Sequence, residues 1–194
     1  MADEKMDLYD IDRTFQNKTI LRKDTIVGDL CRVTIHICLF NKNGEMLIQQ
    51  RSSTKKNLPN VWDITLGGGV LAGENSREAA HRELFEELGI DFDFSNTRPH
   101  FTFNFKNGFD DYYVIVKDID LADVKFSDGE VQAVKWAKEK DILKMIKRGQ
   151  FIGYYPSAIK FLFETYDDHN MFNVKNVKNK KVAKQRKKTY KGQI

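Results

Sequence analysis

A run of three glycines followed by a glutamate-rich helix constrains this chain more than any other feature. The glycines occupy positions 67–69, and the residues after them predict a helix from about Asn75 to Leu88, ended by Gly89. At about 100° per residue, this helix places three glutamates within roughly one 100° arc. They are Glu83, Glu86 and Glu87. The segment therefore predicts an acidic helix face close to a glycine-rich backbone.

The acidic face has the composition of a cation site. Like charges this close on a helix are mildly destabilising, and a bound divalent cation would offset their repulsion. Mg²⁺ prefers hard oxygen ligands and shares its remaining positions with water and substrate phosphate oxygens. A glycine loop, which includes Gly73, would let backbone groups approach a phosphate or the cation closely. A glutamate-rich helix alone is most often a solvated surface, and a glycine cluster alone is usually a turn, so the prediction depends on their combination.

The spacing of these residues resembles the Nudix box. The match runs over residues 68–90 and consists of Gly68, Glu74, Arg82, Glu83, Leu84, Glu86, Glu87, Gly89 and Ile90. The resemblance implies an α/β Nudix fold, in which helices enclose a mixed β-sheet, and a hydrolase that cleaves a diphosphate linkage with Mg²⁺ or, alternatively, Mn²⁺. It implies a metal site formed by Glu83, Glu86, Glu87 and the carbonyl of Gly68. Glu74 would assist these ligands, and Arg82 would orient them.

The stretch before the box is similar to the isopentenyl-diphosphate isomerase branch of the same superfamily. Leu47–Arg51, Lys55-Lys56 and Pro59–Trp62 carry this likeness. It implies that Arg51 and Lys55 hold the substrate diphosphate, a task that suits a forked guanidinium and an ammonium group. The three glycines, Gly67, Gly68 and Gly69, would line the same pocket, and the indole of Trp62 beside them can line it or brace it.

The isomerase reaction itself needs residues that this chain lacks. That branch has a reactive cysteine and a metal-binding histidine where Gly67 and Gly69 stand, and Arg32 occupies the place of another metal-binding histidine. We therefore expect hydrolysis. An isomerase-like enzyme is one alternative, and a non-catalytic ligand-sensing or RNA-binding module is another.

The general base and the substrate stay open at this level. Glu83 or Glu86 on the helix, or Glu130 in a turn, can act as the base. A nucleoside diphosphate derivative is the expected substrate by analogy with the superfamily alone. Aromatic side chains on later strands can stack on a nucleobase, although residues in such a pattern more often belong to a core. They are Phe101, Phe103, Phe105, Tyr112 and Tyr113.

The rest of the pattern predicts one domain over residues 1–173, with continuous structure from about Leu8. Expected strands are Arg32–Phe40, Glu45–Gln50, Trp62–Leu66, Phe101–Phe105, Tyr112–Val116 and Val131–Trp136, and further helices are Lys138–Arg148 and Pro156–Tyr166. No stretch approaches the roughly 20 apolar residues of a membrane helix, and the N-terminus lacks the apolar core of a signal peptide. We expect a cytoplasmic protein without a membrane partner, and the family resemblance allows a homodimer.

The charge is concentrated in the last residues of the chain. Residues 174–194 hold nine Lys/Arg and no Asp/Glu, whereas residues 1–173 hold 23 Lys/Arg and 28 Asp/Glu. Such a block of like charge repels itself and does not pack, so we expect a disordered tail, with weak binding of a polyanion as the alternative role. Cys31 and Cys38 project to opposite faces of a strand and are expected to be buried thiols.

Overall fold

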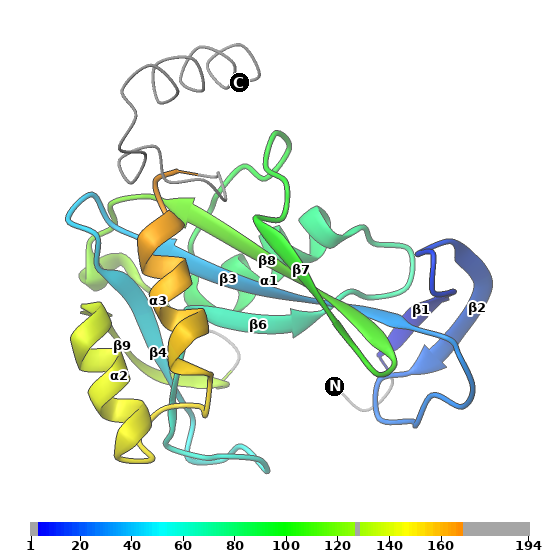
Figure 1. Ribbon diagram of the computed structural model, residues 1–194, viewed down its shortest axis with the longest axis horizontal. Helices are drawn as coiled ribbons and strands as arrows, with labels where there is room; N and C mark the ends of the chain where they lie inside the picture. Colours follow the sequence, from blue (N-terminus) through cyan, green and yellow to red (C-terminus); the bar gives the residue numbers. More distant parts are fainter. Residues whose placement is uncertain (1–3, 127–128, 169–194) are drawn as a thin grey trace, which may run out of the picture.

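The computed structural model describes residues 4–126 and 129–168, which form a mixed β-sheet between helices (Figure 1). The large sheet has seven strands, five of them in the order β5-β4-β3-β8-β7, while β6 pairs with β3 and β9 pairs with β4. The strands are β3 Arg32–Phe40, β4 Met46–Arg51, β5 Trp62–Asp63, β6 Leu66–Gly69, β7 Phe101–Phe105, β8 Gly108–Val116 and β9 Val131–Ala137. The β3–β8 pairing is parallel, and the other pairings between these strands are antiparallel.

Helices cover both faces of this sheet. On one face, α1 (Ser76–Leu88) packs through Ala80, Leu84 and Leu88 against alternate apolar residues of β3. On the other face, α2 (Glu139–Lys147) and α3 (Pro156–Thr165) pack against the intervening residues of the same strand. Cys31 belongs to the first core and Cys38 to the second, and both are free thiols. The predicted α/β/α arrangement is confirmed.

The glutamate-rich helix begins and ends where the sequence predicts. The Asn75 side chain accepts hydrogen bonds from the backbone N–H groups of Arg77 and Glu78, and the Glu78 side chain accepts from the Asn75 N–H in return. Such a reciprocal cap satisfies amide groups that the first turn leaves without partners. At the other end, Gly89 adopts the left-handed conformation with φ of 66°, which glycine reaches without a Cβ clash.

The prediction of a single strand over Trp62–Leu66 is wrong. β5 pairs with β4, whereas β6 pairs with β3, so the two short strands lie on different neighbours. Thr65, which is fully buried between them, accepts a hydrogen bond from the Leu39 N–H at 2.8 Å and donates one to the Leu47 carbonyl at 2.7 Å. Its hydroxyl thus replaces sheet hydrogen bonds where β3 and β4 separate, which strand periodicity does not reveal.

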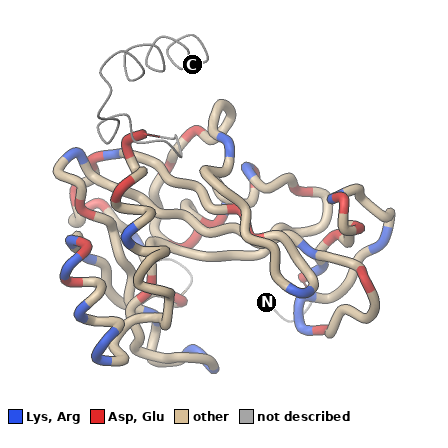
Figure 2. Tube along the Cα trace, in the orientation of Figure 1, with Lys and Arg blue, Asp and Glu red and all other residues tan. Residues whose placement is uncertain are grey.

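An N-terminal hairpin was not predicted. β1 (Lys5–Tyr9) pairs with β2 (Phe15–Leu21) in a separate two-stranded sheet, and structure begins before Leu8, where it was expected. Met6 and Leu8 are buried, but β2 is mostly exposed, so the segment carries little of the apolar alternation that marks a strand. The hairpin carries both acidic and basic positions (Figure 2).

No helix among the described residues is long and apolar enough to cross a membrane. The predicted basic tail, residues 174–194, lies outside the described residues.

Candidate active site

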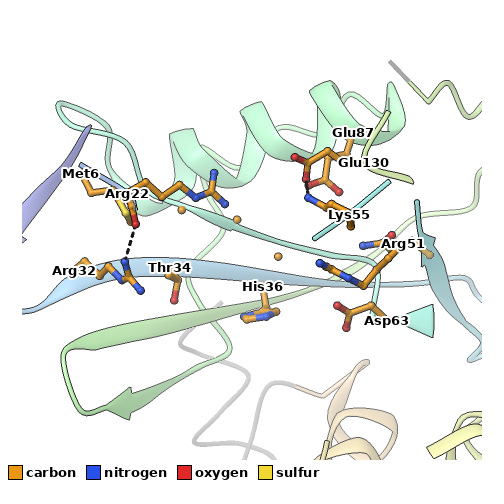
Figure 3. A pocket seen from close by; sticks show the side chains of 14 residues that line it. Met6, Arg22, Arg32, Thr34, His36, Arg51, Lys55, Asp63, Glu87 and Glu130 are labelled. Atoms are coloured by element: carbon orange, nitrogen blue, oxygen red, sulfur yellow. Dashed lines mark hydrogen bonds and ion pairs between the residues drawn. The ribbon is translucent and has the colours of Figure 1, made fainter. Parts of the chain in front are cut away.

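A cavity of about 380 Å³ opens where the hairpin, the sheet and the C-terminal half of α1 meet (Figure 3). Its lining is mostly polar and comes from β3, β4, β6, α1 and the loops beside them. The lining residues are Met6, Arg22, Arg32, Thr34, His36, Gln49, Arg51, Lys55, Asp63, Gly67, Gly68, Gly69, Glu87 and Glu130. The volume suits a small-molecule ligand, since such pockets commonly measure about 300–1,000 Å³.

The floor of the cavity is formed by β3 and β6. Alternate β3 side chains, Arg32, Thr34 and His36, reach it, while the residues between them enter the core under α1. The three glycines of β6 pair in register with this strand, Gly67 opposite His36 and Gly69 opposite Thr34. The bare glycine backbone therefore leaves room for a ligand beside the polar β3 side chains.

The expectation that these three glycines form a loop is wrong, and among residues 67–73 only Gly73 has a positive φ. The three lie in a strand, and what they require is the absence of a Cβ atom. A Cβ on Gly67 would lie 2.8 Å from His36 Nε2, and one on Gly69 would lie 3.1 Å from Met6 Cε. A Cβ on Gly68 would collide with the Glu83 carboxyl group.

The three box glutamates fall into two environments. Glu83 and Glu87 are buried, with 7% and 4% of their surface exposed, whereas the Glu86 side chain is 54% exposed. Burial raises the pKa of Glu83, and this outweighs the opposing effect of the nearby Arg82 and Arg22 guanidinium groups. Two carboxyl groups are thus removed from water beside the glycine strand.

Arg82 lies where an orienting residue is expected. Its guanidinium binds both Glu74 oxygens, at 2.6 and 3.0 Å, and donates to the Gly69 carbonyl at 3.0 Å. It also pairs with Glu83 at 3.0 Å and with Glu86 at 3.2 Å. Burial lowers its pKa, but the pairs with Glu74 and Glu83 raise the pKa of Arg82 overall. The Arg82 guanidinium therefore holds Glu74, Glu83 and Glu86 close to the end of β6.

These donors are of the type that a hard divalent cation prefers, although no group of three His, Cys, Asp or Glu residues within 4–126 and 129–168 is already gathered around one point. Glu83 contacts Gly68, whose carbonyl belongs to the proposed set, and Glu87 lines the cavity. Glu86 is paired with Arg82 and would leave that pair to join the other ligands. Arg82 would still be held by Glu74. The donor chemistry fits the cation, and the gathering would accompany its binding.

Two cationic side chains line the cavity, Lys55 beside Glu87 and Glu130 and Arg51 farther from α1 (Figure 3). Arg51 lines the cavity and donates to the carbonyls of Asn57 and Leu58, at 3.0 and 3.2 Å, which hold its guanidinium in place. Lys55 pairs with Glu130, and both line the cavity. The structure therefore brings Arg51, Lys55 and Glu130 together with Glu87 and the glycine strand.

Trp62 is not among the cavity-lining residues, in contrast to the sequence expectation. It is half-buried against the core under α2 and α3, and the Lys135 ammonium lies 4.0 Å from its ring centre. The aromatic residues of β7 and β8 also lie outside the cavity lining. Tyr113 is fully buried, and Tyr112 is buried against the His36 ring, with 4.7 Å between ring centres.

Sequence reasoning missed several lining residues. His36 Nδ1 lies 2.7 Å from Asp110 Oδ1, and Gln49 and Asp63 are neighbours across the β4–β5 pairing. The β3 residues carry a signal, since polar side chains at 32, 34 and 36 alternate with apolar ones and mark a polar strand face. Met6 and Arg22 carry none, because the hairpin brings them to the cavity from a distant part of the chain.

Comparisons with known proteins agree with this geometry. The family model described as the NUDIX domain matches residues 31–155. A Nudix hydrolase of Listeria innocua is 39% identical over 152 residues, which cover 78% of this chain and 90% of that protein. A crystal structure of a Deinococcus radiodurans protein is similar with a TM-score of 0.66 and 26% identity, covering 81% of this chain and 98% of the other. An isopentenyl-diphosphate Delta-isomerase of Salmonella heidelberg is 38% identical over 66 residues, only 34% of this chain and 36% of that enzyme.

Proposed function

We propose, from the premise that this chain belongs to the NUDIX family and is a Nudix hydrolase, that it cleaves the diphosphate linkage of a nucleoside diphosphate derivative with Mg²⁺ or Mn²⁺. The observation that carries the proposal is the cavity itself. It brings the acid Glu87 and the bare glycine strand together with the cations Arg51 and Lys55, of which Lys55 lies beside Glu87 and Glu130 (Figure 3). A diphosphate between them would have an acidic, cation-binding wall and a basic wall.

The acidic wall is where the divalent cation would bind. Glu83, Glu86, Glu87 and the Gly68 carbonyl would hold it, and when bound it would neutralise phosphate charge and favour ionisation of an attacking water. Arg82 keeps the acids in place, because it joins Glu74, Glu83 and Glu86 to the Gly69 carbonyl. A bound cation would also favour the ionised form of the Glu83 carboxyl group, whose pKa is raised by burial.

The basic wall binds and orients the substrate. Arg51 can donate two parallel hydrogen bonds to phosphate oxygens, and Lys55 adds a point charge beside it. The carbonyls that hold the Arg51 guanidinium limit its freedom before the substrate arrives, so less conformational entropy is lost on binding. These contacts would hold the scissile phosphate in one orientation.

Glu130 is the general base that we propose among the three candidates. It lines the cavity and is held by Lys55, whereas Glu86 is outside the lining and Glu83 is turned against Gly68. From this position the Glu130 carboxylate can accept a proton from a water that attacks the diphosphate. A Glu130→Gln variant should then lose turnover while binding substrate nearly as well as the wild type.

The isomerase alternative lacks its reactive group. No cysteine lines the cavity within the described residues, and burial raises the pKa of the Cys38 thiol well above its usual range. Both cysteines are buried in the two cores. A thiol that isomerised a prenyl diphosphate would need to reach the substrate, so this arrangement favours hydrolysis.

A substrate panel tests the proposed function. The protein would be incubated with nucleoside diphosphate sugars, nucleoside di- and triphosphates, dinucleotide cofactors and isopentenyl diphosphate, each with Mg²⁺, with Mn²⁺ or with a chelator, and products would be identified by mass spectrometry. We expect metal-dependent cleavage of a diphosphate linkage that Glu87→Gln abolishes and Glu164→Gln, at an exposed position of α3, does not. Isomerised isopentenyl diphosphate without released phosphate would overturn the assignment.

A further inference from the structure

A second pair of cations stands at the end of the cavity away from Arg51 and Lys55. Arg22 follows β2, and Arg32 begins β3, and Figure 3 shows both beside Met6 at that end. Arg51 and Asp63 lie at the opposite end, close to His36 (Figure 3). His36 lies four positions after Arg32 on the strand, which corresponds to roughly 13 Å. The cavity is therefore basic at two separate places.

Arg32 has fewer partners than a guanidinium normally has in a protein. Its Nε is buried and without a hydrogen-bond partner, and Nη1 makes only a long contact of 3.4 Å with the Arg22 carbonyl oxygen. Within residues 4–126 and 129–168, Arg32 forms no ion pair with an acidic side chain. A buried cationic donor without an acceptor is costly, so a ligand that supplied acceptor oxygens would be favoured.

Arg22 faces the same space from the hairpin. Its Nη1 pairs with Glu4 at 2.7 Å, and its Nε lies 3.8 Å from the place where a Cβ of Gly69 would stand. Its side chain is 42% exposed, so it can reorient toward a ligand without breaking a core contact. Met6 closes the wall beside it, because its Cε lies close to the same glycine.

These hairpin residues lie outside the segment that matches the family model. The match starts at residue 31, whereas Met6 and Arg22 precede it, and Arg32 lies at its edge. The Nudix box and the Arg51–Lys55 pair already provide for a diphosphate. The N-terminal cations are therefore an addition that the diphosphate alone does not require.

We propose that Arg22 and Arg32 form a second anion-binding subsite, which takes a phosphate group beyond the scissile diphosphate. The inference rests on the proposed function for the position of that diphosphate, between α1 and Arg51. Two guanidinium groups suit phosphate because each offers a rigid fork of N–H donors to its oxygens. The favoured substrates then carry a chain of at least three phosphates, and the hairpin contributes directly to their recognition.

Metal-free binding of inorganic polyphosphates tests the subsite without turnover. Tripolyphosphate and pyrophosphate would be titrated into the full chain by isothermal calorimetry in the presence of a chelator. The wild type should bind tripolyphosphate at least about tenfold more tightly, which is the size expected for one added charge-assisted contact. Arg22→Gln and Arg32→Gln should each remove most of this preference and leave pyrophosphate affinity within about twofold.

Matched variants separate the subsite from general charge loss. Lys23→Gln removes an exposed charge next to Arg22 and should change neither affinity, whereas Arg51→Gln should weaken both ligands. Arg32→Lys keeps the charge and should retain part of the preference. Equal affinity of the wild type for the two ligands would overturn the proposal, and so would an equal loss for both ligands in the Arg22 and Arg32 variants.

The two proposals fail independently. If the substrate panel shows no hydrolysis, the polyphosphate preference can still be present, because the titration contains no metal and needs no cleavage. If hydrolysis occurs but the preference is absent, the proposed function stands and the second subsite is rejected. Circular dichroism and melting temperature of each variant would verify that it is folded.

Discussion

Asp111 and the residues of the cavity form two polar clusters, and they differ in how fully their hydrogen bonds are satisfied. The Asp111 side chain has no exposed surface, and both of its oxygens are engaged. Arg13 binds both oxygens, Ser76 donates to one at 2.6 Å, and Thr102 donates to the other at 2.7 Å. These partners come from the hairpin, α1 and β7, so one carboxylate joins three parts of the fold.

The cavity cluster, in contrast, contains buried polar atoms whose hydrogen bonds are not satisfied. Arg32 Nε and Gln49 Oε1 are buried without hydrogen-bond partners, and burial raises the pKa of Glu83 and of Asp63. Asp110 follows the sheet alternation and faces this side with His36, whereas its neighbour Asp111 faces α1. Buried polar groups with a full set of hydrogen bonds stabilise the fold, whereas those without partners are available to a ligand. Substitutions in the Asp111 cluster should therefore lower stability, and substitutions in the cavity should lower ligand binding.

The largest expected effect on stability is that of Asp111→Asn. The change removes the charge that pairs with Arg13 and leaves buried donors without a full set of acceptors, so we expect a loss of about 3–5 kcal/mol in the free energy of unfolding. Urea denaturation would measure it. Asp118→Asn, which disrupts an exposed pair with Lys42, should give no measurable loss. A similar effect of the two variants would remove the distinction between the clusters.

Arg51→Gln is expected to have the opposite profile. It removes one fork of donors to the diphosphate, so KM should rise by about 10- to 100-fold, while the free energy of unfolding changes little. Steady-state kinetics on the substrate found in the panel would measure it. Arg98→Gln, which lies outside this cavity, serves as the control. An unchanged KM would exclude Arg51 from substrate binding.

The pH dependence of stability should also distinguish the clusters. Burial tends to raise the pKa of Asp111, but the hydrogen bonds from Arg13, Ser76 and Thr102 outweigh it and lower that pKa below its usual 3.8. A lowered folded-state pKa means that the stabilisation is present above the unfolded value and is lost as the pH falls through the folded one. The difference in unfolding free energy between the wild type and Asp111→Asn should therefore shrink below about pH 4. A difference that stays constant down to pH 2 would contradict this account.

The smallest expected effect on stability is that of Glu83→Gln. Because burial raises the pKa of Glu83, its ionised form is disfavoured in the folded protein, and a neutral amide of similar size should leave the melting temperature unchanged or slightly higher. The cost of weakening the pair with Arg82 is limited, since Arg82 keeps Glu74. A marked drop in melting temperature, measured without metal, would place Glu83 in the structural cluster.

Much of this fold could be read from the sequence because its signals are local. The helix Ser76–Leu88 is defined by the Asn75 cap and by Gly89, and β3 by its apolar run. The identity of the box acids also follows from spacing, because residues three and four apart share a helix face. Arg51 and Lys55 were identified from the family pattern, and the structure places both in the cavity.

The parts that could not be read depend on long-range contacts. The role of Arg13 is set by Asp111, 98 residues away, and Arg22 reaches the cavity only because β1 pairs with β2. The separate strands β5 and β6 depend on Thr65, whose hydroxyl bonds to backbone groups of two other strands. The glycines were identified correctly but for another reason, since Gly67 and Gly68 give space to His36 and Glu83.

Direct measurement of cation binding tests the central claim, that the box glutamates on α1 form the metal site of a Nudix hydrolase. Free Mn²⁺ would be followed by electron paramagnetic resonance as the wild type, Glu83→Gln, Glu87→Gln and the control Glu164→Gln are added. We predict tight binding by the wild type and the control, and a loss of about 10- to 100-fold in affinity for each box variant. Equal Mn²⁺ affinity in all four proteins would contradict the assignment of α1 as the metal-binding element.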